Sequence, residues 1–133
     1  MSPGRTHMKK FIAFLTFVMI STNAHAIFLR TCYNHTLGND AVSYSYQSCI
    51  NSNFREIQRS LDEYIFLAHC SNFGDRVNYA FTNCINRNFN EIERQLNQPV
   101  YLPHCSNFRP ETLDFSFESC VRRNFYEIER QID

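Results

Sequence analysis

The chain has 133 residues, with 13 basic and 13 acidic side chains, six cysteines, 15% aromatic residues and no tryptophan. This length fits one small domain or a short repeat array, and the balanced charge argues against a nucleic-acid-binding protein, whose affinity depends on a clustered basic excess. A chain with 44% hydrophobic residues is too apolar to remain disordered. We therefore expect a folded protein whose partner is not a nucleic acid.

The first 26 residues have the pattern of a bacterial Sec-type signal peptide. A cationic start at Met8 precedes an apolar run from Phe11 to Ile20, and small residues end the segment at Ala24 and Ala26. Residues 1–7 lie upstream of this pattern, which makes Met8 the expected true start. The apolar run is shorter than the roughly 20 residues that cross a bilayer, so an uncleaved anchor is the weaker alternative. The pattern predicts a periplasmic or secreted protein, cleaved after Ala26, with no transmembrane segment in the mature chain.

Cleavage after Ala26 changes the charge balance. Arg5, Lys9 and Lys10 lie in the leader, which leaves 10 of the 13 basic residues, all arginine, against all 13 acids, for a net charge of about −3. All six cysteines follow the leader. An even number of cysteines in a small exported chain predicts a disulfide framework, because an oxidising compartment preserves the bonds.

Residues 27–133 contain three copies of one unit of about 36 residues. The first cysteines of the three units are Cys32, Cys70 and Cys105. The second cysteines are Cys49, Cys84 and Cys120. An Ile-Phe-Leu-like string precedes each first cysteine, and each second cysteine opens a Cys-Ile-Asn-x-Asn-Phe-x-Glu-Ile-like string. The units are residues 27–62, 63–97 and 98–133, which we expect to form one structural domain.

Each unit is predicted to be a connector, extended or turn-like, followed by one amphipathic helix. Relative to the second cysteine, apolar residues fall at positions −7, −3, 0, +1, +5, +8 and +12, which is the spacing of one buried helix face. Turn-forming and acidic residues at 38–40, 74–75 and 110–111 are expected to start the helices. The fold prediction is mostly α, as a small disulfide-stapled helical array or a three-helix bundle.

The sequence leaves open the structure of the segment before each helix and the pairing of the cysteines. The segments 42–46, 77–81 and 113–117 also alternate apolar and polar residues, so a strand before each helix is an alternative. The simplest disulfide pairing lies within units, where each bond closes a loop of about 15 residues and contributes roughly 3 kcal/mol. The shifted pairing joins Cys49 to Cys70, Cys84 to Cys105 and Cys32 to Cys120. Six cysteines allow either scheme.

His69 and His104 directly precede cysteines, which makes metal binding through these pairs one hypothesis. Two thiolates and one imidazole leave a tetrahedral zinc site one ligand short, and Thr31 takes the place of the histidine in the first unit. The sequence therefore predicts no metal site, no catalytic residue and no cofactor.

Several polar residues recur in every unit, and we expect them to be structural because an active site normally occurs once. Asn53, Asn88 and Asn124 lie beside the buried stripe and are expected to bond to connectors. Glutamates at 56, 91 and 127 precede arginines at 59, 94 and 130 by three positions, which favours ion pairs along the helix. Arg122 and Arg123, particular to the last unit, are expected on a solvated face.

A functional surface is therefore expected where the three units present side chains together. Tyr44, Tyr79 and Phe115 fall outside the buried stripe, either as an exposed aromatic row or packed under a connector. The predicted function is a non-enzymatic protein-binding or structural module whose partner is another exported or envelope protein. The alternative is a small secreted hydrolase, toxin or enzyme inhibitor that uses the irregular first loop around His35.

Overall fold

Three helices follow one another in chain order in the computed structural model, which describes residues 27–35, 40–61, 65–96 and 98–132. They are α2 (Tyr44–Ser60), α3 (Tyr79–Gln95) and α4 (Phe115–Ile132). The described residues contain no strand, so the mostly α prediction is confirmed and the strand alternative is wrong. The predicted leader with its cleavage site, and residues 36–39 of the first loop, lie outside the described residues.

The helices begin later than the turn residues predict. Ser43, Asn78 and Asp114 are the residues that precede the first helical positions. The Ser43 hydroxyl accepts a hydrogen bond from the Tyr46 N–H at 3.2 Å, as an N-cap side chain does. The turn residues that were expected to start the helices therefore belong to the loops ahead of them.

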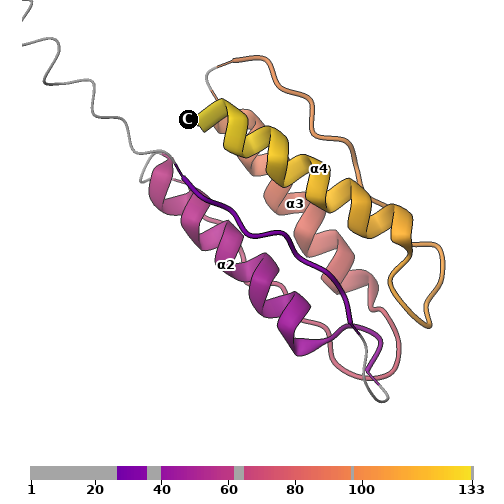
Figure 1. Ribbon diagram of the computed structural model, residues 1–133. Coiled ribbons are helices and arrows are strands. Elements are labelled where there is room, and N and C mark those ends of the chain that lie inside the picture. Colours follow the sequence, from indigo (N-terminus) through magenta and orange to yellow (C-terminus); the bar gives the residue numbers. More distant parts are fainter. Residues whose placement is uncertain (1–26, 36–39, 62–64, 97, 133) are drawn as a thin grey trace, which may run out of the picture.

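The three helices run parallel and in register. Phe54, Phe89 and Phe125 each lie five positions after the second cysteine of their unit, and their ring centroids are 5.2–5.4 Å apart in all three pairings. The meeting of equivalent residues at one point places the helices at the same height, and Figure 1 shows that they run in the same direction. The fold is therefore a closed three-helix bundle with an approximate threefold axis, rather than an open array.

Layers of equivalent apolar side chains fill the axis above and below the phenylalanine trio. These side chains are at most 1% exposed: Tyr46, Phe81, Phe117, Ile50, Ile85, Val121, Ile57, Ile92 and Ile128. Burial of such side chains stabilises a fold by roughly 1.5–3 kcal/mol each. The stripe of period 3.6 in the sequence is thus the common interior of the bundle.

Each helix is preceded by an extended connector that runs back along the bundle: connector 1 (residues 27–35), connector 2 (residues 65–73) and connector 3 (residues 100–108). Connector 1 lies between α2 and α4 (Figure 1). In connector 2, Ile65 and Leu67 are buried and Phe66 between them is exposed. This alternation follows from the period of two of an extended chain.

The disulfides join each connector to the helix of its own unit. They pair Cys32 with Cys49, Cys70 with Cys84, and Cys105 with Cys120, with Cα–Cα distances of 5.6–5.7 Å. The pairing within units is therefore the one that the structure contains. Three such bonds indicate an oxidising, extracytoplasmic location. In the part of the chain that the structure describes, no helix has the length and apolar character needed to span a bilayer.

A buried asparagine also holds each connector against its own helix. Asn53 accepts from the Arg30 N–H at 2.8 Å and donates to the Arg30 carbonyl at 2.9 Å. Asn88 makes the same pair with Ala68 at 2.9 and 2.8 Å. In the third unit Pro103 has no N–H, and Asn124 only donates to its carbonyl, at 2.9 Å. The predicted structural role of these asparagines is confirmed.

A second set of side chains holds each connector against the helix of the preceding unit; we call each such contact a seam. The first seam joins α2 to connector 2, and the second joins α3 to connector 3. Asn51 binds the N–H and the carbonyl of Cys70 at 2.8 and 2.7 Å. Asn86 binds Cys105 in the same way, at 2.8 Å for both bonds. Because these contacts repeat, connectors 2 and 3 each lie between two neighbouring helices and are bonded to both.

The closing seam joins α4 to connector 1 and completes the ring. Arg122 stands where the other helices carry Asn51 and Asn86, and its guanidinium donates to the Cys32 carbonyl at 3.4 Å. Its side chain is only 21% exposed, so the prediction that it lies on a solvated face is wrong. Arg123 is exposed as expected. The closing seam is therefore built by the last helix and the first connector.

Candidate functional site

The repeated glutamate–arginine pairs are ion pairs on the helix surfaces. Glu56 lies 3.3 Å from Arg59 and Glu127 lies 3.2 Å from Arg130, while Glu91 pairs with Arg94. The three arginine side chains are 58–73% exposed. Pairs at this spacing and exposure stabilise a helix by about 0.2–0.5 kcal/mol. Their predicted role as helix supports is confirmed.

The histidine–cysteine pairs present no thiolate. All six cysteines are in disulfides, and both His69 and His104 are exposed. Among residues 27–35, 40–61, 65–96 and 98–132, no group of three or more His, Cys, Asp or Glu side chains is placed to hold a metal ion. The metal-binding alternative therefore lacks its ligands in this part of the chain.

The irregular first loop is described only as far as His35. This residue is exposed, and its ring centroid is 6.1 Å from that of Tyr33. The neighbouring Asn34 has a structural role, because its side chain donates to the Ala41 carbonyl at 3.1 Å and accepts from the Ser43 N–H at 2.8 Å. The rest of the loop lies outside the described residues, so a function of this loop around His35 stays a prediction.

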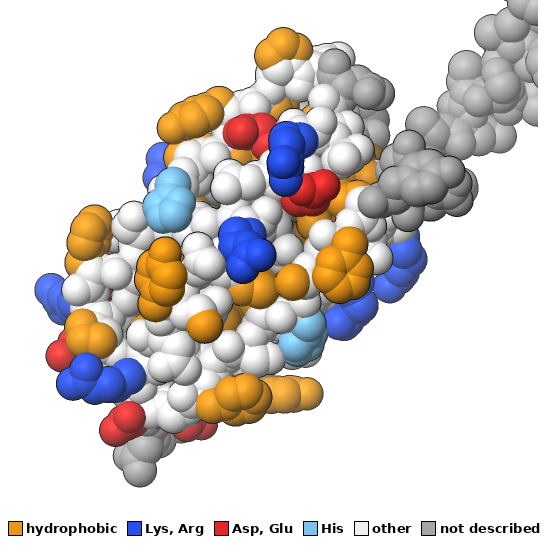
Figure 2. All heavy atoms as spheres, turned by 180° about the vertical axis from the view of Figure 1, so that it is seen from behind, with side chains coloured by type: hydrophobic (Ala, Val, Ile, Leu, Met, Phe, Trp, Pro, Cys, Tyr) orange, Lys and Arg blue, Asp and Glu red, His pale blue; other side chains and the backbone are white. Residues whose placement is uncertain are grey.

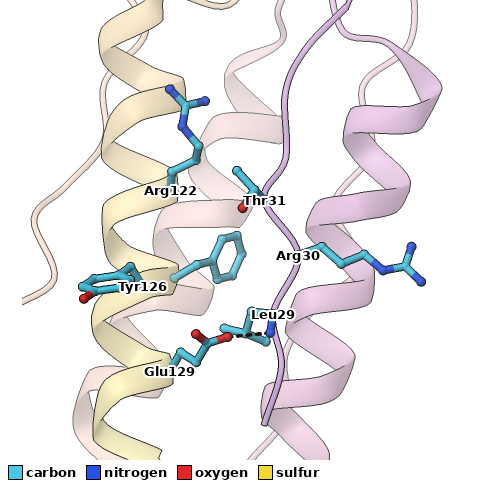
Figure 3. Close-up of a pocket in the computed structure, with 7 residues that line it drawn as sticks. Leu29, Arg30, Thr31, Arg122, Tyr126 and Glu129 are labelled. Carbon is cyan, nitrogen blue, oxygen red and sulfur yellow. Dashed lines mark hydrogen bonds between the residues drawn. The ribbon is translucent and has the colours of Figure 1, made fainter.

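A small cavity of about 80 Å³ lies at the closing seam. The Leu29 N–H donates to a Glu129 carboxylate oxygen at 2.7 Å across it (Figure 3). Arg30 points away from α4, and Tyr126 projects outward from the helix (Figure 3). Since Glu129 and Arg122 are both used to hold connector 1, this cavity belongs to the bundle closure.

Exposed aromatic rings are the surface feature that distinguishes the molecule. Five of them lie at the end of the bundle where the helices begin, and we call them the amino-end aromatics: Tyr44, Tyr79, Phe115, Phe73 and Phe108. Each is 78–83% exposed. The first three are the opening residues of the three helices, and the other two follow the Cys-Ser-Asn turns of connectors 2 and 3. Tyr44, Tyr79 and Phe115 are thus exposed and do not pack under a connector.

The connectors carry a second set of exposed rings that the sequence interpretation missed. Phe28, Phe66 and Tyr101 occupy equivalent positions, four residues before the first cysteine, and are 77–82% exposed. The signal was present, since each is the middle residue of an Ile-Phe-Leu-like string. Reading that string as an extended segment with two buried ends would have placed the middle ring in solvent. Figure 2 shows such side chains as separate orange groups over one face of the molecule, with arginines among them.

One buried polar atom has no partner. The hydroxyl of Tyr46 makes no hydrogen bond among the described residues, although the ring is 1% exposed. Burial, followed by the nearby Glu118 carboxylate, raises the pKa of Tyr46 above its usual value, and Arg122 opposes the shift. The other two units carry Phe81 and Phe117 at this position. The hydroxyl is enclosed in the core and faces no cavity that a substrate could enter.

The arrangement as a whole can present side chains rigidly, because each unit is fixed by one disulfide and by buried amide hydrogen bonds. The asparagines that recur in every unit are occupied by those contacts, and the recurring glutamates and arginines pair with each other. Most of the exposed area of the amino-end aromatics is left open, although the Arg122 guanidinium lies 5.8 Å from the ring centroid of Phe115. Comparison with models of protein families, with curated protein sequences and with solved structures finds no match to this chain.

Proposed function

We propose that the chain is an exported, non-enzymatic module that binds another protein, and that the amino-end aromatics form the contact surface. The observation that carries the proposal is the presence of five large rings, each about four-fifths exposed, at one end of a cross-linked bundle. Leaving a large ring in water gains nothing for folding, whereas a partner that covers it gains the hydrophobic contribution.

The size of the surface supports a protein partner. Aromatic side chains bury roughly 150–250 Å² each, so five rings at this exposure offer on the order of 600–1,000 Å². One partner in a standard protein complex contributes about 800 Å². The amino-end aromatics with their polar surroundings are therefore large enough for a specific interface.

The composition of the surface points the same way. Protein interfaces are enriched in Tyr, Phe and Arg and depleted in Lys, and residues 27–133 contain ten arginines and no lysine. The three disulfides support export of the module, and the leader pattern in residues 1–26 supplies the route.

The test is capture of the partner in the native compartment by the full chain and by two matched variants. The first replaces Tyr44, Tyr79 and Phe115 with serine, and the second replaces Phe28 and Tyr126, two exposed rings elsewhere on the bundle, with serine. We expect the wild-type protein and the second variant to retain the same partner after cross-linking, and the first variant to lose it. An intact mass that is six hydrogens short of the reduced chain, with an unchanged Tm, would show that each variant keeps its three disulfides and its fold.

Two results would contradict the proposal. Repeated cross-linking that recovers no protein partner for the wild-type chain would remove the binding function. Equal capture by the wild-type chain and by the variant without Tyr44, Tyr79 and Phe115 would remove the amino-end aromatics as the contact surface.

A further inference from the structure

The second and third units carry the same groove between a connector and the helix of its own unit. The third-unit groove is lined by Tyr101, Pro103, Cys120, Arg123, Asn124 and Glu127. The same six positions line the second-unit groove, as Phe66, Ala68, Cys84, Arg87, Asn88 and Glu91. The volumes are about 190 and 450 Å³. Because two units with different sequences form the same groove, its lining follows from the repeat and not from an accident of one loop.

Each groove contains one arginine without a carboxylate partner. Within the described part of the chain, neither Arg87 nor Arg123 is in an ion pair, whereas Glu91 and Glu127 are already paired with arginines at positions 94 and 130. The amides at the base of the grooves, Asn88 and Asn124, are bound to the connectors. The guanidinium is therefore the charged group of each groove that lacks an ion-pair partner among the described residues, and it lies beside an exposed aromatic ring.

We propose that these two grooves bind carboxylate side chains on an extended acidic segment of the partner protein. The inference rests on the proposed function, because it names the chemistry of that partner. A guanidinium binds a carboxylate through two parallel hydrogen bonds, and Phe66 or Tyr101 takes the apolar side chain next to it. Acids outnumber arginines after residue 26, so the attraction for an acidic segment comes from the local guanidinium of each groove and not from the net charge of the chain.

The shape of the grooves favours a segment of a protein over an enclosed small molecule. Phe66, Arg87 and Tyr101 are all exposed, so the walls do not surround a ligand as the pockets for small molecules do. The second-unit groove also extends to Ala80, the residue after Tyr79. It thus reaches the first turn of α3, which begins with Tyr79.

The first unit changes two positions of the groove. Phe28, Asn53 and Glu56 keep the aromatic, amide and acidic positions. Ser52 replaces the helix arginine, and Arg30 replaces Ala68 and Pro103 on the connector. The inference assigns binding to the helix arginine, so it predicts that Ser52→Arg adds a site in the first unit.

The experiment uses ¹⁵N-labelled, oxidised protein produced from the full chain, with a synthetic peptide of alternating glutamate and phenylalanine as the probe. A peptide of alternating lysine and phenylalanine is the charge control, and an oligomer of galacturonate tests an acidic carbohydrate. We expect the acidic peptide to shift the side-chain N–H resonances of Arg87 and Arg123 and the amides around them. Arg87→Ser and Arg123→Ser should each weaken binding by about tenfold, because a charge-assisted pair is lost.

Matched variants separate the groove from total charge. Arg76→Ser removes one exposed arginine from a loop outside both grooves and should leave the affinity for the acidic peptide within about twofold, whereas the double variant at 87 and 123 should abolish the shifts. Ser52→Arg should add shifts in the first unit. Equal weakening by Arg76→Ser and Arg87→Ser, equal binding of the basic peptide, or binding of the galacturonate oligomer without the peptide would each overturn the inference.

The same variants keep this inference distinct from the proposed function. If the double variant still captured the native partner with wild-type affinity, the grooves would be excluded and the amino-end aromatics would stand. If the wild-type chain captured no protein, the proposed function itself would fail.

Discussion

The first seam and the closing seam each hold a connector against the helix of another unit, the first through uncharged side chains and the second through charged ones. In the first seam, α2 binds connector 2 through three uncharged amides: Gln47, Asn51 and Gln58. In the closing seam, α4 binds connector 1 through three charged side chains at the same positions: Glu118, Arg122 and Glu129. The glutamine and glutamate oxygens accept backbone N–H groups at 2.7–2.9 Å in both seams. What the repeat preserves is therefore a polar side chain of suitable reach at each position, and not its charge.

The two seams differ in strength at the middle one of these three positions, which is Asn51 in the first seam and Arg122 in the closing seam. An asparagine satisfies both the N–H and the carbonyl of the cysteine that it faces, whereas arginine has only donors. Arg122 therefore satisfies the carbonyl of Cys32 alone, and it gains other contacts on the surface of the seam. Its guanidinium lies 4.7 Å from the ring centroid of Tyr33 and 3.8 Å from the Glu118 carboxylate. We expect the closing seam to be the weaker one and to open first in local unfolding.

The largest effect is expected from Asn86→Ala in the second seam. The substitution leaves the buried N–H and carbonyl of Cys105 without the two bonds that Asn86 makes, which should cost about 2–4 kcal/mol. Urea unfolding of the oxidised protein measures this change in the free energy of unfolding. A loss below about 1 kcal/mol would show that the amide bonds are not what holds the connector.

A smaller loss is expected from Arg122→Ala in the closing seam. The variant gives up one hydrogen bond at 3.4 Å, an ion pair and a cation–π contact, which together should contribute about 1–2 kcal/mol. Arg122→Asn restores the residue of the other seams, so its loss should be smaller than that of alanine. The proposed ranking of the seams would be reversed if Arg122→Ala cost more than Asn86→Ala in the same urea experiment.

Tyr46→Phe is expected to change stability in the opposite direction. The substitution removes the only buried hydroxyl that lacks a partner among the described residues, so it should stabilise the protein by about 1 kcal/mol. Phe81→Tyr, which adds a hydroxyl at the equivalent position of the second unit, is the matched control and should destabilise. Thermal unfolding of both variants checks the signs. A lower Tm for Tyr46→Phe would mean that the hydroxyl has a bonding partner.

The smallest effect is expected from Glu129→Gln. Gln58 already performs the same task in the first seam, with its side-chain oxygen 2.9 Å from the Leu67 nitrogen. An amide oxygen in place of the carboxylate should therefore cost less than about 0.5 kcal/mol, while Glu129→Ala should cost about 1 kcal/mol. Comparable losses for the two variants in urea unfolding would show that charge matters more than the position of the acceptor.

Much of the fold could be predicted from the sequence because the sequence contains three copies of the unit. The period, the two cysteines per unit and the stripe of apolar residues each recur, and agreement between copies separates them from chance. The exact helix starts could not be predicted in this way. Ser43, Asn78 and Asp114 differ in identity, and the more conspicuous turn residues ahead of them belong to the loops.

Most of what was missed depends on contacts between segments. Arg122 looks like a surface residue in a helix read alone, and its partner Cys32 is 90 positions away. The paired grooves likewise require a connector and the helix of its own unit to lie side by side. The periodicity of a single helix carries no information on such contacts, whereas the buried stripe needs nothing else. The exposed connector rings are different, because the period of two of an extended chain would have predicted them.

The closure of the bundle is tested most directly by nuclear Overhauser effects between aromatic rings in the oxidised protein. The closed bundle predicts contacts in all three pairings of Phe54, Phe89 and Phe125, including the pair from the first and last helices, whose centroids are 5.2 Å apart. An open array of three units would give the pairs 54–89 and 89–125 only. Absence of the Phe54–Phe125 contact, with the other two present, would contradict the closed bundle.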